Sequence, residues 1–149
     1  MKRFVFRLES LLKLRRLQRD LSQKRLSEAV QFDEQLLAQR KQFEASRALQ
    51  LEQMRSMGGA GEMDVDAAST RRYFATQLIG DVAQIEQQRY VLSKHIAKCR
   101  SEVVLADQAV RALEKLEEKQ RAEFTFEQEC RTQRELEETW QATQSGGRP

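Results

Sequence analysis

The chain has 149 residues, of which 26 are lysine or arginine, 23 are aspartate or glutamate and 7% are aromatic, with a formal net charge of +3. Alanine, glutamate, lysine, leucine and arginine together account for 75 residues, about half of the chain, which is typical of coiled coils and long single helices. The scarcity of β-branched and aromatic residues argues against a β fold, and no run of apolar residues approaches the roughly 18 needed for a transmembrane helix.

The first predicted helix spans about residues 3–56 and carries an apolar stripe that is less regular than a coiled-coil seam. Polar side chains interrupt the stripe, and other apolar residues lie on its flank, a pattern expected from stutters or from a second contact face. The stripe consists of Phe4, Leu8, Leu11, Leu14, Leu17 and Leu21, then Ala29, Phe32, Leu36 and Phe43; the interruptions are Arg25, Gln39 and Arg47, and the flanking residues are Leu26, Val30 and Leu37.

A glycine-rich turn is predicted at residues 57–64, where three of the six glycines fall within four residues. After it, Asp64 or Asp66 can cap the N-terminus of a second helix that spans about residues 66–143. Residues 145–149 are expected to be a disordered tail.

The second predicted helix has a heptad seam in which eleven of twelve positions are apolar over six heptads. The one exception is Arg89, a polar seam residue of the kind that can set register. The expected coiled-coil core includes Leu78, Val82, Ile85, Leu92, Ile96, Cys99, Val103, Val110 and Leu113, together with Ala75 and Ala106.

Two long amphipathic helices joined by a short turn are expected to fold back on each other. The predicted fold is therefore all-α, a two-helix antiparallel coiled-coil hairpin with a longer second helix, forming a single domain over residues 1–149. Residues whose numbers sum to about 122 should then lie opposite each other. This register predicts an ion pair from Arg89 to Asp33 or Glu34, and it leaves residues beyond about 119 without an intramolecular partner.

No catalytic constellation is present, and we expect no enzymatic activity, no cofactor and no metal. His95 is the single histidine, and Cys99 and Cys130 are too few for a disulfide framework, so we expect reduced thiols in the cytoplasm. Residues 1–25 hold nine basic and two acidic side chains, but they lack the aromatic pattern or groove-entering module of a nucleic-acid binder. A solvated basic face is the favoured interpretation.

The C-terminal part of the second helix stays apolar after the seam ends, on a displaced stripe that includes Phe124, Phe126, Leu136 and Trp140. Because this part is expected to lack a partner in its own chain, the stripe suggests docking onto another protein. Self-dimerisation through the stripe is the alternative.

The N-terminal segment from Phe4 to Arg15, FVFRLESLLKLR, resembles the opening of the FliJ family of flagellar export proteins. The central break, the Arg71-Arg72-Tyr73-Phe74 segment and the acidic stretch Arg134-Glu135-Leu136-Glu137-Glu138 are similar to that family too. The resemblance thus spans nearly the whole chain.

This resemblance implies a non-enzymatic central stalk and general chaperone of flagellar type III protein export. It implies as partners a FliI-like export ATPase hexamer, an FlhA-like export gate protein and export chaperones, with a location at the flagellar base, peripheral to the inner membrane through those partners. On the basis of this resemblance, we expect that the ring of the export ATPase is contacted by Phe4, Leu8, Phe124, Phe126, Leu136 and Trp140. We expect that exposed residues near the bend contact the gate protein.

Three other interpretations stay open. A virulence-type secretion stalk resembles this family in architecture. A coiled-coil scaffold would show a stable parallel dimer, and a basic nucleic-acid binder would show strongly salt-dependent binding to DNA.

Overall fold

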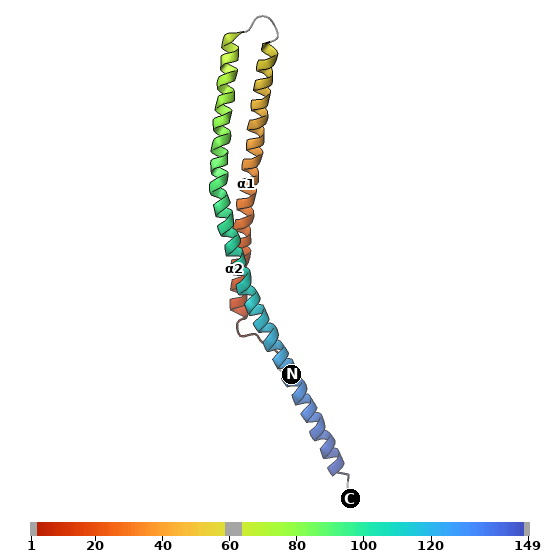
Figure 1. Cartoon of the computed structure of the whole chain (residues 1–149). Helices are drawn as coiled ribbons and strands as arrows, with labels where there is room; N and C mark the ends of the chain where they lie inside the picture. Colours follow the sequence, from red (N-terminus) through yellow and green to blue (C-terminus); the bar gives the residue numbers. More distant parts are fainter. Residues whose placement is uncertain (1–2, 59–63, 148–149) are drawn as a thin grey trace. The chain divides into compact units, whose positions relative to one another are not determined.

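A computed structural model describes residues 3–58 and 64–147 of the chain (Figure 1). Two helices account for nearly all of them, α1 (Glu9–Met57) and the longer α2 (Val65–Ser145), and the described residues contain no strand. The predicted all-helical, antiparallel two-helix fold is confirmed. Of the predicted glycine-rich turn, residues 59–63 lie outside the described residues, as do residues 148–149 of the predicted tail.

The chain enters α1 later than predicted, because residues 3–6 are not helical and the helix begins at Glu9 instead of at about residue 3. The Glu9 amide donates to the Phe6 carbonyl at 3.3 Å, which closes the turn before the helix. A helix would turn Phe4 and Phe6 about 200° apart. From this non-helical segment both rings pack on α2, Phe6 in the cluster with Val110 and Phe4 against Phe124.

The start of α2 confirms one of the two caps that the sequence offered. The Asp64 carboxylate accepts hydrogen bonds from the backbone amides of Asp66 at 3.1 Å and Ala67 at 3.3 Å, so Asp64 is the cap. At the other end, α2 includes Ser145, and the Gly146 amide donates to the Ala142 carbonyl at 3.1 Å. The helix therefore extends two residues beyond the predicted end at about residue 143.

The structure divides into two compact units, each pairing part of α1 with part of α2. The first unit comprises the described residues of Met1–Asp20 and Val104–Pro149, and the second comprises those of Leu21–Val103. The expectation that residues 1–149 act as a single domain stays a prediction.

In the second unit, the two helical segments lie side by side and run in opposite directions (Figure 1). Their contact is mostly apolar on α2 and includes charged side chains on α1. Every seam position predicted on this part of α2 is buried or half-buried. The buried residues of this unit are Ala29, Leu36, Ala75, Leu78, Ile85, Ile96 and Cys99.

In the first unit, a small cluster holds the N-terminal segment and the start of α1 against α2. Leu12 and Val110 are almost fully buried, at 2% and 0% exposure, and Phe6 completes the cluster. Phe4 and Leu113 are partly buried against it. The predicted seam position Val110 is thus at the centre of this unit.

The apolar stripe predicted for α1 is wrong over its first half. Its five leucines from Leu8 to Leu21 are all exposed, whereas Leu12, which the prediction left out, is buried. The contact with α2 follows a different heptad, Leu12, Arg19, Leu26, Asp33 and Arg40, in which all five residues are buried or half-buried. Since three of these five residues are charged, the pattern of apolar residues along α1 did not predict which face of the helix contacts α2.

Candidate interaction surfaces

A pair of opposite charges lies within the helix contact of the second unit. Arg89 on α2 donates from Nε to Asp33 Oδ1 at 3.0 Å and from Nη2 to Asp33 Oδ2 at 3.3 Å. The two side chains are only 26% and 28% exposed. The predicted ion pair is confirmed, with Asp33 as the partner. The hydrogen bond that Arg89 donates to Asp33 raises the pKa of the Arg89 guanidinium, with a further contribution from the negative charges of Asp33 and Glu86.

The pair belongs to a larger charged network, in which Glu86 links the two arginines. Arg40 lies 2.6 Å from Glu86 and 3.0 Å from Glu44, and Arg89 lies 3.8 Å from Glu86. The hydrogen bond to Glu44 and the charge of Glu86 raise the pKa of Arg40. Two of these pairs, Arg89–Asp33 and Arg40–Glu86, join the two helices and form only in this register, so they can select it.

Replacing Arg89 with methionine is expected to lower the urea midpoint of unfolding, because Asp33 then keeps a half-buried negative charge without its partner. The pKa of Arg89 is raised in the folded protein. The charged guanidinium therefore contributes fully to the free energy of unfolding below the ordinary arginine pKa, and this contribution is lost only above it. The difference between variant and wild type should therefore be constant from neutral to moderately alkaline pH. Arg100→Met, at an exposed position of α2, is the control, and an equal effect there would contradict the role of the pair.

Phe124 extends the contact of the first unit further along α2 than predicted. Its ring centroid lies 5.7 Å from that of Phe4, with the planes tilted by 53°, and the Arg121 guanidinium lies 5.2 Å from the Phe4 centroid. The prediction that residues beyond about 119 have no intramolecular partner is therefore wrong for Phe124. A helical residue advances only about 1.5 Å along the axis, whereas residues 3–6 are not helical, so Phe4 lies past the position that a continuous helix would give it.

Beyond this contact, residues 125–145 of α2 form a segment that we call the tail helix. All of its residues from 131 onward are exposed. Phe126, Leu136 and Trp140 are 66, 65 and 63% exposed, although they are among the largest apolar side chains of the chain. Leu136 and Trp140 are four residues apart and so lie on one side of the helix. The tail helix thus presents an apolar stripe without a partner in the described residues.

The six residues predicted to contact a ring fall into two groups. Phe4 and Phe124 pack on each other and are half-buried, so they support the fold of the first unit. Leu8, Phe126, Leu136 and Trp140 are exposed. The structure therefore makes these four available for contact, and their role stays a prediction.

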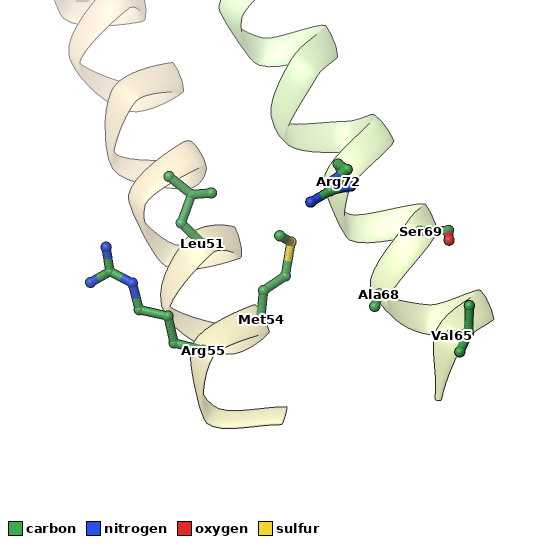
Figure 2. A pocket seen from close by; sticks show the side chains of 7 residues that line it. All are labelled: Leu51, Met54, Arg55, Val65, Ala68, Ser69 and Arg72. Carbon is green, nitrogen blue, oxygen red and sulfur yellow. The ribbon is translucent and has the colours of Figure 1, made fainter. Parts of the chain in front are cut away.

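In the second unit, a cleft lies between the last turns of α1 and the first turns of α2. Figure 2 shows Met54 pointing from α1 toward α2 between the two helices. Tyr73 and Phe74, just after the cleft in α2, are exposed. The sequence predicted exposed residues near the bend without naming the cleft, whose lining is Leu51, Met54, Arg55, Val65, Ala68, Ser69 and Arg72.

Polar contacts tie the two helices together beside this cleft. Arg71 donates to the side-chain carbonyl of Gln50 at 3.2 Å, and it also bonds Gln53. Arg71 is thereby held in the helix contact, while its neighbour Arg72 lines the cleft. Of these two adjacent arginines, Arg71 therefore joins the two helices, whereas Arg72 is available at the surface of the cleft.

Residues 3–58 and 64–147 contain no group of three histidine, cysteine or carboxylate side chains placed to bind a metal ion. Nor is any helix in this part of the chain both long and apolar enough to cross a bilayer. Cys99 is buried, with its Sγ 3.5 Å from Nε2 of His95, and Cys130 is half-buried.

Comparison with known proteins gives one match. The family model described as "Flagellar FliJ protein" matches residues 4–145, which include both helices from end to end. No curated protein and no solved structure matches the chain. The relationship of this chain to known proteins therefore rests on the family match, which covers nearly the full length of the chain.

Proposed function

The chain belongs to the FliJ family of flagellar export proteins, and from this premise we propose that it is a non-enzymatic stalk that binds the ring of the export ATPase and links it to the export gate. A location at the flagellar base agrees with the family. Attachment to the inner membrane would be indirect, through these partners.

The observation that carries the proposal is the tail helix. A surface helix of a monomer normally turns its large apolar side chains inward, yet Phe126, Leu136 and Trp140 are about two-thirds exposed. A single helix is also narrow, about 10–12 Å across with its side chains, so it can enter an opening that would exclude a globular domain. We therefore assign the ATPase contact to Phe126, Leu136 and Trp140, with Leu8 as an additional contact.

The cleft at the bend is the proposed contact for the gate. Exposed Tyr73 and Phe74 lie beside it, and Arg55 and Arg72 line it. Exposed aromatic and arginine side chains are enriched at the centres of protein interfaces. Export chaperones are proposed as further partners, in line with the family resemblance, and we assign no surface to them.

The proposal is tested by the rate of ATP hydrolysis and the oligomeric size of the purified cognate export ATPase, with and without this protein at matched salt. We expect faster hydrolysis and a shift toward the hexamer, since a stalk that contacts several subunits favours the closed ring. No effect, with protein of proven helicity, would favour the coiled-coil scaffold instead. Activity only with the ATPase of a virulence-type system would favour the stalk of such a system.

A further inference from the structure

The first turns of α1 expose a row of leucines that the fold does not use. Leu11, Leu14 and Leu17 are 36, 48 and 56% exposed. Leu14 is two residues from buried Leu12, and two residues turn a helix by about 200°, so Leu14 points away from the contact with α2. We call Leu11, Leu14 and Leu17 the leucine face. It is an apolar surface in the first unit, separate from the stripe of the tail helix.

The surroundings of the leucine face are basic. Residues 3–20 contain six arginines or lysines and only two carboxylates. Lys13 lies four residues before Leu17 and Arg15 lies four residues after Leu11, so both flank the face. A partner for this surface should combine apolar side chains with negative charge.

The tail helix has that combination. It contains five glutamates and two arginines, and its apolar stripe is exposed. Glu129 lies one heptad before Leu136, and Glu137 lies three residues before Trp140, so both glutamates border the stripe. Both surfaces lack a partner among residues 3–20 and 104–147 of the first unit, both are apolar, and their charges are opposite in sign.

The two surfaces cannot meet within one chain. The contact of Phe4 with Phe124 fixes the N-terminal segment beside the part of α2 that precedes the tail helix. From there α2 continues without a break for 21 more residues, about 30 Å, away from that contact. Their complementarity can thus be satisfied only between two copies.

We propose that two copies of this chain associate about a twofold axis, with the tail helix of each copy on the leucine face of the other. In a twofold-symmetric dimer the same contact occurs twice, so even a small surface contributes twice to the free energy of association. Each contact then places a third helix beside the α1 and α2 segments of a first unit. If the proposed ATPase contact also holds, the second copy and the ATPase compete for Leu136 and Trp140.

The dimer is tested by sedimentation velocity of the full chain over a range of concentrations at low and high salt. We expect a monomer–dimer equilibrium in which the dimer becomes weaker as the salt concentration rises. The Debye screening length falls from about 10 Å at 0.1 M to about 3 Å at 1 M ionic strength, so the opposite charges attract each other less. This measurement uses no ATPase, so its outcome is independent of the stalk proposal.

Two charge-reversed variants identify the surfaces. The head variant carries Lys13→Glu and Arg15→Glu, and the tail variant carries Glu129→Lys and Glu137→Lys. Each alone should raise the dimer dissociation constant by about tenfold or more, since like charges then face each other. An equimolar mixture should dimerise again, because both contacts of the mixed dimer regain opposite charges. Circular dichroism establishes that each variant is as helical as the wild type.

Three results would overturn the proposal. They are a wild-type chain that is monomeric at every concentration, a dimer that both variants leave unchanged, and variants that fail to recover when mixed. A monomeric chain that cosediments with phosphatidylglycerol vesicles through the leucine face would also overturn it, and would assign that face to an anionic lipid surface.

Discussion

Leu12→Ala is expected to lower the free energy of unfolding of the first unit by about 2–3 kcal/mol, toward the low end of the range for buried leucines because the cluster is small. Leu12 is 2% exposed and packs in the cluster with Phe6 and Val110. Its truncation removes apolar contacts from α1 and from the N-terminal segment together. Hydrogen exchange of residues 9–20 should accelerate more than that of the second unit, because the lost contacts lie in the first.

Leu14→Ala is the matched control, since it makes the same change two residues away on the same helix, at a side chain that is 48% exposed. We expect a change within about 0.5 kcal/mol at a protein concentration low enough to keep the chain monomeric. The two variants also separate the two possible seams of α1. A larger loss for Leu14→Ala than for Leu12→Ala would restore the leucine stripe as the contact face and would contradict the structure.

The sequence predicts α2 better than α1, for a physical reason. In α2 the contact positions are apolar apart from Arg89, so Leu78, Ile85 and Ile96 repeat with the heptad and are buried. In α1 the contact positions include Arg19 and Asp33, so counting apolar residues follows the exposed leucines instead. An apolar pattern locates a contact face only where that face is apolar.

The ion pair of Arg89 shows how a long-range contact can still be predicted. The heptad placed Arg89 in the seam of α2, and the antiparallel register about the bend placed a carboxylate opposite it. The structure has Asp33 there, at 3.0 Å. The same arithmetic failed at the N-terminus, because residues 3–6 are not helical and a rule based on the helical rise does not apply to them.

The candidate surfaces were predicted only in part. The apolar stripe of the tail helix could be recognised because Phe126, Leu136 and Trp140 continue after the seam ends. Whether Phe124 belongs to that stripe or to the fold could not be decided, since this depends on where Phe4 lies. The cleft at the bend depends on the spacing of the two helix ends, which no pattern along the chain specifies.

Replacing Leu136 and Trp140 with serine is expected to abolish association with the export ATPase while leaving the helix content unchanged. Both side chains are more than 60% exposed, so their loss costs the fold little. At an interface, burial of each large apolar side chain contributes roughly 1.5–3 kcal/mol, so the double variant should weaken binding by a hundredfold or more. Association is measured by sedimentation of the ATPase with this protein, and helix content by circular dichroism at 222 nm.

Tyr90→Ser with Val91→Ser is the matched control, because this pair also joins an aromatic and an aliphatic side chain on α2, at 59 and 60% exposure. The control lies in the second unit, far along the helix from the tail, and should bind the ATPase as the wild type does. Equal binding by both double variants would remove the tail helix from the stalk proposal. Equal loss in both would show instead that α2 contacts the ATPase along much of its length, since an exposed apolar pair outside the tail would then matter as much as the stripe.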